Sequence, residues 1–351
     1  MGYKRIGEKI NELKGSKLSV KEKRMQKCFL KSLADCNNMY NGLINVYKEP
    51  GFTSMDAVAV LRGILKQKKI GHTGTLDPAA EGVLMVCLGN ATKLCTFLED
   101  KDKEYECRML LGTETDTEDT TGSVLRKTDV ECSEEEIADA INSFIGDIKQ
   151  IPPMYSALKK DGKKLYELAR EGKVIEREAR DIKIYGIDIK EIKIPDVTFT
   201  VHCSKGTYIR SLCRDIGEKL GCGGCMEHLK RTAVSFFEEK DSLKLSEIET
   251  LAKEGKIDEF ILPTSDVFSD LKSLYVKEES TKIIANGNPL LWSNVEKIVD
   301  TKNLRVSNIE DIKENNGEFE MFKVYTSENY FMAVYRYDAE NDIFKCEKMF
   351  L

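Results

Sequence analysis

The sequence predicts an α+β fold in which a sheet core is covered by helices and is followed by a small β-barrel. Two observations predict the first part: apolar runs typical of strands recur between residues 41 and 240, and amphipathic helical patterns separate them. A third predicts the barrel, because residues 271–351 contain mostly short strand-like runs and one short helix. At 351 residues the chain is long enough for two or three domains.

Residues 1–38 form a basic, polar extension that we expect to be helical or disordered, with Met39 as an alternative start. Residues 1–31 hold ten Lys and Arg against three Glu, so the remaining 320 residues carry −13 within a total net charge of −6. A polyanionic partner would therefore have to meet local basic patches, such as residues 62–69 and 154–174.

Composition excludes several classes of protein. The longest apolar stretch, "GVLMVCLG", is far shorter than the roughly 20 residues that a membrane-spanning helix needs. The basic N-terminus lacks the apolar core of a signal peptide. The 11 cysteines are scattered, which is typical of reduced thiols that pack as small hydrophobes. We therefore expect a cytoplasmic protein without disulfides and without a membrane partner.

The core begins with a strand and a helix. "NGLINVYK", residues 41–48, is a short apolar strand closed by a Pro-Gly turn. We expect Ser54 to cap the following helix. The apolar positions of that helix recur at helical spacing: Val58, Leu61 and Leu65.

Strand and helix patterns continue along the chain. "GVLMVCLG", "KEYECRMLLG", "DIKIYGIDIKEIKI" and "VTFTVHCS" read as strands, the first too apolar to lie outside a core. Ser133 and Glu136 form a capping box that begins a helix. "GTYIRSLCRDIGEKLG" is a second helix, with one apolar face formed by Ile209, Leu212, Cys213, Ile216 and Leu220.

The segment "IPPMYSALKKDGKKLYELAREGK" differs from these core elements. It starts with a stiff Pro-Pro turn and ends in a short basic helix closed by Gly172. Such a pattern is typical of an excursion over the surface.

A polar loop, "GHTGTLDP", joins two of these segments and contains His72 and Asp77. Asp before Pro is a common turn element, so the loop can be a plain turn. A carboxylate held in a short loop between rigid elements is also well placed for nucleophilic or electrostatic work. Glu81, four residues further on, allows a paired-carboxylate glycosidase, but this spacing occurs by chance and the chain has one Trp for stacking sugars.

The stretch "CGGCMEH" places Cys222, Cys225 and His228 at spacings that zinc sites use. Zinc prefers four ligands, and the stretch also reads as a turn between a helix and a strand. We expect neither a metal nor an organic cofactor.

The polar loop belongs to a larger set of motifs. "GHTGTLDPAAEGVLMVCLGNATKL" resembles the catalytic signature of the TruB family of tRNA pseudouridine synthases. The other family segments occur in the family's order, with "NGLINVYKEPGFTSMDAV" before this signature and, after it, "KEYECRMLLGTETDTEDTTG", "QIPPMYSALKKDGKKLYELAREG", "GTYIRSLCRDIGEKLG" and "HLKRTAVSFF". The resemblance covers about residues 41–240, and the tail resembles, less sharply, the PUA-type RNA-binding module.

The resemblance implies a catalytic domain over residues 39–270 with a central mixed, mostly antiparallel sheet, an RNA-gripping insertion at about 150–180, and a PUA-like domain over 271–351. It implies three catalytic residues, Asp77, Tyr105 and Arg210. Arg210 offers a bidentate fork that would keep Asp77 ionised and aimed. The substrate-binding residues that it implies are His72, Tyr208, Leu229, Lys48, Lys159, Lys163 and Lys164.

The reaction implied is isomerisation of uridine to pseudouridine in the T-loop of tRNA, at position 55, with the base flipped out of the loop. The partner is then the T-arm of tRNA, met by a monomer. Two departures from the family pattern are Glu81, where Thr or Ser is commoner, and "KEPG" in place of "KPxG". The alternative is a non-catalytic RNA-binding or tRNA-folding factor. Without the resemblance, Arg210 could instead pair with Asp215 or Glu218 on its own helix.

Overall fold

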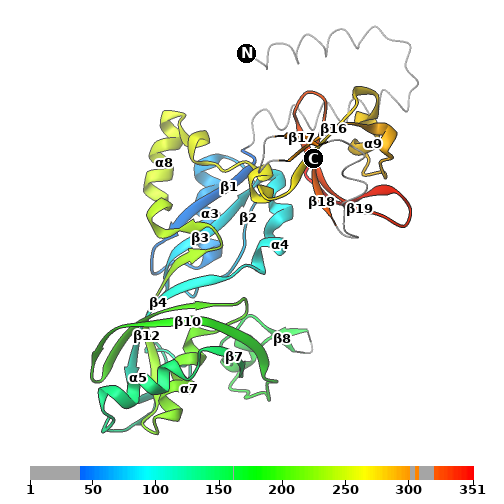
Figure 1. Ribbon diagram of the computed structural model, residues 1–351. Helices are drawn as coiled ribbons and strands as arrows, with labels where there is room; N and C mark the ends of the chain where they lie inside the picture. Colours follow the sequence, from blue (N-terminus) through cyan, green and yellow to red (C-terminus); the bar gives the residue numbers. More distant parts are fainter. Residues whose placement is uncertain (1–39, 161, 301–304, 308–319) are drawn as a thin grey trace. The chain divides into compact units, whose positions relative to one another are not determined.

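The computed structural model describes residues 40–160, 162–300, 305–307 and 320–351. The predicted extension over residues 1–38 lies outside the described residues. The chain divides into two compact units, which are described separately: a larger one of Ile44–Cys87 and Leu94–Ile257, and a smaller one that includes Leu88–Lys93 and Asp258–Leu351 (Figure 1).

A ten-stranded mixed sheet forms the centre of the larger unit. Its main path is β14-β1-β3-β12-β4-β11-β10-β7, with β13 beside β12 and β2 beside β3. The strands are β1 (Gly42–Lys48), β2 (Ile70–His72), β3 (Glu81–Leu88), β4 (Lys103–Leu111), β7 (Gly146–Gln150), β10 (Arg180–Lys193), β11 (Asp196–Cys203), β12 (Gly224–Val234), β13 (Phe237–Glu238) and β14 (Leu243–Lys244). Antiparallel pairing runs from β12 through β4, β11 and β10 to β7, whereas β1–β14 and β3–β12 are parallel. The predicted mixed, mostly antiparallel sheet is confirmed.

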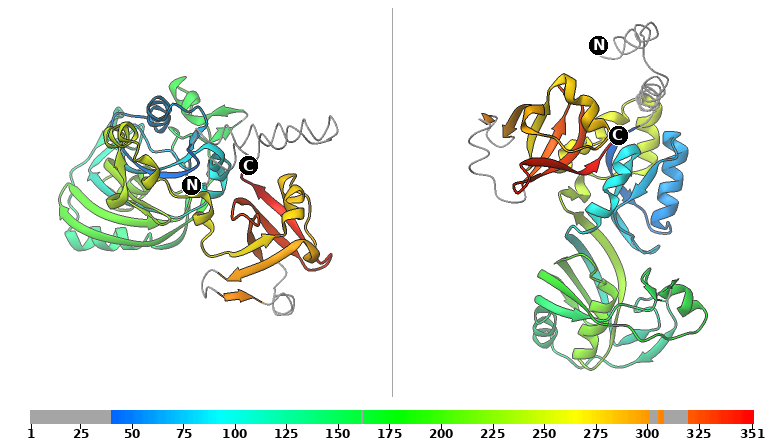
Figure 2. Two further views of the ribbon diagram at one scale, coloured as in Figure 1. Left: turned by 90° about the horizontal axis from the view of Figure 1, so that it is seen from above. Right: turned by 90° about the vertical axis from the view of Figure 1, so that its right-hand side faces the viewer.

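Helices and two small hairpins complete the larger unit. The helices are α3 (Ser54–Leu65), α4 (Cys95–Glu99), α5 (Glu134–Asn142), α6 (Leu165–Arg170), α7 (Ile209–Lys219) and α8 (Leu245–Glu254). The hairpins are β5 (Thr113–Thr115) with β6 (Val124–Lys127), and β8 (Lys159–Lys160) with β9 (Lys163–Lys164). Both α5 and α7 pack on one face of the antiparallel part of the sheet, as two further views also show (Figure 2).

The N-cap predicted for α3 was wrong by one residue. Thr53, not Ser54, caps the helix, because Thr53 and Asp56 form a complete capping box in which each side chain bonds to the other residue's backbone N–H. Ser54 is buried and has a different role, described below. The capping box predicted at Ser133 and Glu136 is confirmed at the start of α5.

Strand alternation separates the two faces of the sheet. On β4, Tyr105, Cys107 and Met109 point into the core beneath α7, while Glu104 and Glu106 point away from it. The predicted apolar face of α7 is confirmed, with the first four of its five positions buried: Ile209, Leu212, Cys213 and Ile216. Because the middle of the inward face is buried, a side chain on this face can reach a substrate only at the edge of the core.

The smaller unit contains a six-stranded sheet in the order β17-β16-β15-β18-β19-β20. Its elements are β15 (Lys272–Val276), α9 (Thr281–Ala285), β16 (Val295–Asp300), β17 (Arg305–Ser307), β18 (Met321–Tyr325), β19 (Phe331–Asp338) and β20 (Ile343–Met349). Its core is aromatic, with Phe322, Tyr335 and Phe344 fully buried. The small β module expected at the C-terminal end is confirmed. None of the helices in the described ranges is long and apolar enough to cross a membrane.

Strands β3 and β12 approach each other closely at Gly82. Gly82 has φ +102°, and a Cβ atom placed on it would lie 2.3 Å from the carbonyl oxygen of Arg231. Only glycine fits this position, because both the backbone conformation and the space exclude a side chain. The contact matters because Gly82 follows the polar loop directly.

We predict that Gly82→Ala lowers the free energy of unfolding by about 2 kcal/mol or more. The matched control is Gly63→Ala on the exposed side of α3, where a Cβ atom meets nothing within 4 Å. There the higher helix propensity of alanine should raise stability by about 0.5–1 kcal/mol. Urea unfolding followed by far-UV circular dichroism measures both changes. Equal effects of the two substitutions would contradict the close approach of β3 and β12.

Candidate active site

The polar loop between β2 and β3 is anchored to α3 through Ser54. The backbone N–H of Leu76 donates to the Ser54 hydroxyl at 2.9 Å, and this hydroxyl donates to the Leu76 carbonyl at 3.3 Å. Ala80 N–H donates to the carbonyl of Asp77 at 3.1 Å, which closes a turn around the aspartate. The Asp77 side chain keeps 37% of its surface exposed, so its carboxylate is held rigidly and still faces solvent.

Lys48 anchors the same loop from β1. Its ammonium donates to the carbonyls of Phe52 at 2.7 Å, Glu49 at 3.1 Å and Pro78 at 3.3 Å. Burial lowers the pKa of Lys48 to about 8, against the opposing effect of Asp77. The side chain has no exposed surface, so the expected direct contact of Lys48 with a substrate is corrected to a role in holding the loop.

Arg210, at the start of α7, faces Asp77 with two nitrogens. Its Nε lies 3.0 Å from Oδ2 of Asp77, and its Nη2 lies 3.2 Å from Oδ1. The other N–H groups donate to the carbonyls of Thr117 at 3.2 Å and Tyr155 at 2.9 Å, and Nη1 lies 3.7 Å from Oδ2 of Asp119. The expected contact between Arg210 and Asp77 is present, and the guanidinium is surrounded by acceptors from three separate segments.

Burial raises the pKa of the Asp77 carboxyl above its ordinary value, and Arg210 opposes this shift while Asp119 adds to it. Arg210 favours the ionised form of Asp77, as expected, while burial acts in the opposite direction and has the larger effect on the pKa. The ionised carboxylate is therefore only partly solvated. Such a group is a stronger base and nucleophile than an ordinary surface aspartate.

Tyr105 and Leu229 form an apolar wall in the same core cluster as Leu76, the residue before Asp77. Both side chains are 7% exposed. Tyr105 on β4 lies directly opposite Arg231 on β12. Burial raises the pKa of Tyr105, with Arg231 opposing the shift, so the phenol stays neutral.

Tyr208 lies immediately before α7. Buried Gln150 holds its backbone by two hydrogen bonds, accepting from the N–H at 2.9 Å and donating to the carbonyl at 3.1 Å. Its ring is half-buried, and burial raises the pKa of its phenol. His72, at the end of β2, is also half-buried, and burial followed by the charge of Arg231 lowers its imidazole pKa. Both side chains therefore present neutral rings at pH 7.

Arg231, Asp119 and Gln150 were not singled out from the sequence. Arg231 is fully buried; its Nε donates to the Val83 carbonyl at 2.7 Å and its Nη2 to the Gly74 carbonyl at 3.3 Å. One feature of the sequence could have indicated Arg231. It lies two residues after Leu229, and residues two apart on a strand share a face, so a charged side chain is placed on the inward face. Asp119 and Gln150 had no local signal, because their partners are distant in sequence.

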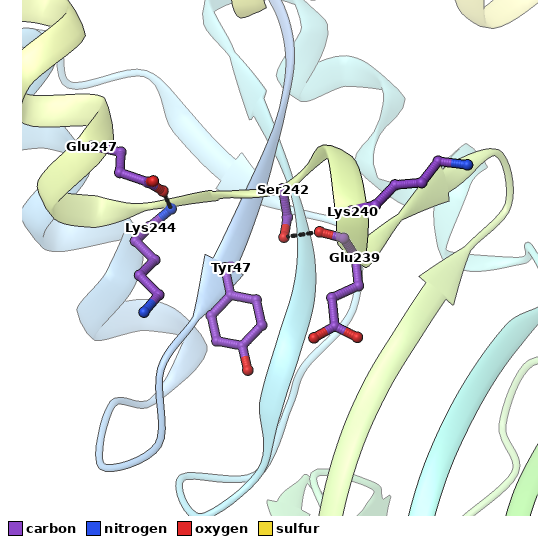
Figure 3. A pocket seen from close by; sticks show the side chains of 6 residues that line it. All are labelled: Tyr47, Glu239, Lys240, Ser242, Lys244 and Glu247. Atoms are coloured by element: carbon purple, nitrogen blue, oxygen red, sulfur yellow. Dashed lines mark hydrogen bonds between the residues drawn. The ribbon is translucent and has the colours of Figure 1, made fainter.

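Glu81 does not pair with Asp77. Its carboxylate accepts from the Tyr47 hydroxyl at 2.8 Å and lies 3.0 Å from Nε2 of His228. This removes the basis for a paired-carboxylate glycosidase. A separate pocket lies beside Tyr47, where the Ser242 hydroxyl donates to the Glu239 carbonyl and the Lys244 backbone N–H donates to the Glu247 carboxylate (Figure 3). It is lined by Tyr47, Glu239, Lys240, Ser242, Lys244 and Glu247.

The CxxCxxH stretch is used for packing and hydrogen bonding. His228 contacts Glu81, and the buried thiol of Cys222 donates to the Gly223 carbonyl. Cys225 is fully buried in β12. Among the described residues, no three His, Cys, Asp or Glu side chains are grouped so as to hold a metal ion.

Lys159, Lys163 and Lys164 lie on the β8–β9 hairpin. Lys159 and Lys163 are exposed, and Lys163 lies 3.7 Å from Glu171. The Lys164 ammonium sits 5.3 Å from the centre of the Tyr166 ring. In this hairpin Lys159 is directly opposite Lys164, so like charges face each other across the strands.

Comparison with known proteins agrees with this geometry. Residues 62–209 match the model of the TruB family pseudouridylate synthase N-terminal domain, and residues 210–269 match that of the tRNA pseudouridylate synthase B C-terminal domain. The chain is 49% identical over 321 residues to the tRNA pseudouridine synthase B of Lachnoclostridium phytofermentans, covering 89% of this chain and 100% of the relative. It is 49% identical over 261 residues to that of Alkaliphilus oremlandii, covering 74% and 85%.

Two solved structures are also similar to this chain. A chain of an H/ACA RNP bound to a substrate RNA containing 2'-deoxyuridine is 25% identical, with a TM-score of 0.62, covering 88% of this chain and 85% of that one. A chain of a Cbf5-Nop10-Gar1 complex is 27% identical, with a TM-score of 0.63 and the same coverage. The fold and these matches define an isomerase that makes pseudouridine. The chain belongs to the TruB family of pseudouridylate synthases.

We predict that the difference in melting temperature between Asp77→Asn and wild type depends on pH. Because the folded-state pKa of Asp77 lies above its ordinary value, ionisation costs the folded state more free energy than it costs the unfolded chain. This cost is absent at pH values below the ordinary aspartate pKa of about 4 and reaches its full size above the folded-state pKa. The wild type, but not the variant, should therefore gain stability as the pH falls from 7 towards 4, in addition to changes that both proteins share. A difference in melting temperature that is the same at pH 7 and pH 4 would contradict the assigned direction.

Proposed function

We propose that this protein converts the uridine at position 55 in the T-loop of tRNA to pseudouridine, with Asp77 as the catalytic carboxylate. The observation that carries the proposal is the bidentate Asp77–Arg210 pair, held in a rigid loop and still open to solvent. Relatives named tRNA pseudouridine synthase B, at 49% identity, support the choice of tRNA.

The chemistry needs one anchored anion and a site that excludes water. The N-glycosidic bond of uridine breaks, the uracil turns, and C5 bonds to C1' of the ribose while C5 loses its proton. No atom is oxidised and no group leaves the site, so the reaction proceeds without a cofactor. Asp77 begins it by attacking the sugar or the base, and both routes start from the ionised carboxylate that Arg210 aims.

Tyr105 and Leu229 would form the wall on which the uracil lies. A base that is remade must leave its stack, and a flat apolar surface offsets part of that loss. The raised pKa of Tyr105 supports packing rather than base catalysis, because the phenol remains protonated at neutral pH. The half-buried Tyr208 ring lies beside this site and would close it. The neutral ring of His72 would occupy the space that the base leaves in the T-loop.

The basic insertion at about 150–180 would grip the RNA backbone. Its hairpin sets Lys159 opposite Lys164 and Lys160 opposite Lys163, an arrangement that is unfavourable by itself. A polyanion relieves this repulsion, which supports phosphate contacts by these lysines. The proposed organisation is a catalytic domain over 39–270 and a PUA-like domain over 271–351, acting as a monomer on the T-arm in the cytoplasm.

Asp77→Asn should abolish pseudouridine formation. We expect a loss of at least about a thousandfold in single-turnover rate, equal to about 4 kcal/mol of barrier, because the amide cannot act as an anion. Pseudouridine is mapped by position on a tRNA transcript, with the exposed Asp188→Asn as the matched control. Conversion by Asp77→Asn would disprove the catalytic assignment. Tight binding of tRNA by the wild type without any pseudouridine would instead favour the non-catalytic RNA-binding alternative.

Neutralising Lys159, Lys163 and Lys164 to Gln should reduce the salt dependence of tRNA binding. Each phosphate contact contributes a slope of about −0.7 to −0.9 in a plot of log affinity against log salt, so we expect a reduction of about 2. The matched control is Lys253→Gln on α8, an exposed lysine that pairs with Glu249. Buried Lys48→Met should also leave the slope unchanged. A slope unaffected by the triple substitution would exclude these lysines as phosphate contacts.

A further inference from the structure

A second arginine, Arg214, lies one turn after Arg210 on α7. Its guanidinium forms an ion pair with Glu118 and donates to the carbonyl of Ile151 at 3.1 Å. Its Nε also donates to Asp215 at 2.9 Å. Arg214 is only partly exposed, with 26% of its side-chain surface accessible.

Arg210 and Arg214 hold the same two segments of the chain. Arg210 contacts Thr117 and Asp119 in the turn between β5 and β6, while Arg214 contacts the intervening Glu118. Arg210 also contacts the Tyr155 carbonyl and Arg214 the Ile151 carbonyl, both at the start of the basic insertion. Residues four apart on a helix share a face, so the two arginines act as an inner and an outer clamp.

The outer clamp holds a strained residue. Glu118 has φ +63°, a left-handed conformation that costs a residue other than glycine about 1 kcal/mol or more. Its side chain is buried and also accepts from the Ser211 hydroxyl at 2.6 Å, while its carbonyl accepts from the Met226 N–H at 3.0 Å. These contacts to α7 and β12 maintain the conformation that turns Thr117 and Asp119 towards Arg210.

We infer that Arg214 and Glu118 are positioning residues for the reaction: they hold the Thr117–Asp119 turn and the start of the insertion so that Arg210 aims Asp77. This rests on the proposed catalytic role of Asp77. Neither residue contacts Asp77, so both act on the reaction only through the position of Arg210. Their loss should therefore slow the chemical step and leave tRNA binding almost unchanged. The inference thus adds Arg214 and Glu118, which lie outside the site itself, to the residues on which the reaction depends.

The test is Arg214→Met, which keeps most of the apolar stem and removes the guanidinium. We expect the single-turnover rate of pseudouridine formation on a tRNA transcript to fall about tenfold to a hundredfold, with Kd for tRNA within threefold of wild type. Arg214→Lys, which keeps the charge facing Glu118, should recover part of the rate. The matched control, Lys219→Met, removes a positive charge from the same helix where it contacts Ser143, and should change neither quantity.

The pH profile separates positioning from a merely structural role. The charged groups facing Asp77 are Arg210 from α7, Asp119 from the turn and Lys48 from β1. If Arg210 is released from its clamp, burial and Asp119 raise the pKa of Asp77 further, so the acid limb of the rate profile moves to higher pH. A structural defect would lower the active fraction and the melting temperature without moving this limb.

Glu118→Gln keeps the shape of the side chain and gives a second test if Arg214→Met fails to fold. We expect the same shift of the acid limb and a smaller loss of rate. Wild-type rate and acid limb in a folded Arg214→Met or Glu118→Gln variant would overturn the inference, as would a loss of binding with an unchanged chemical step. These outcomes are distinct from failure of the proposed function, in which the wild type itself would form no pseudouridine.

Discussion

The ion pair between Asp77 and Arg210 is the interaction on which the site depends. Arg210 is almost fully buried, and a buried guanidinium is stable only when its N–H groups find acceptors. The chain supplies them from the polar loop, from the turn around Thr117 and Asp119, and from the start of the insertion. Each of these segments therefore contributes acceptors to one side chain, and the geometry of the Asp77–Arg210 pair follows from it.

The polar loop is held by buried polar groups rather than by secondary structure of its own. Ser54 bonds to Leu76 on one side of Asp77, Lys48 bonds to Pro78 on the other, and Arg231 bonds to Gly74 near the start of the loop. Burying an unpaired lysine or arginine is costly, but here backbone carbonyls accept their protons. The loop carbonyls and the buried cations thus satisfy one another, which makes the loop stiff.

Periodicity predicted the elements of the larger unit well, because apolar alternation and helical spacing are local properties of the chain. The N-cap of α3 was misassigned because Thr53 and Ser54 are both good caps, and the choice depends on Asp56 three residues after Thr53. Lys48 was expected to bind the substrate, and its burial could not be predicted, because the carbonyls of Glu49, Phe52 and Pro78 meet its ammonium only in the folded chain.

The sequence predicted the residues of the site less completely than it predicted the helices and strands. Asp77 was first noticed as a carboxylate in a short loop, and its catalytic role, like those of Tyr105 and Arg210, came from the family resemblance. No spacing in the sequence indicates that Arg210 reaches a carboxylate 133 residues away. Asp119 and Gln150 escaped notice because they act on Arg210 and on the backbone of Tyr208 across the fold. Local patterns therefore predict the scaffold, whereas the site is defined by pairings of buried polar groups that only the tertiary structure reveals.

The distribution of charge explains how an acidic chain can meet a polyanion. On the face of the sheet away from α7, acids are neutralised within the sheet: Lys230 lies between Glu106 and Glu239, and Arg108 pairs with Glu227. The β8–β9 hairpin is richer in positive charge, since it sets four lysines opposite one another on two short strands, of which Lys163 lies close to an acid, Glu171. Fields of exposed charges decay over about 8–10 Å at physiological salt, so only nearby charges matter at any one place on the surface. Local charge, rather than the net charge of the chain, then determines where a phosphate backbone can bind.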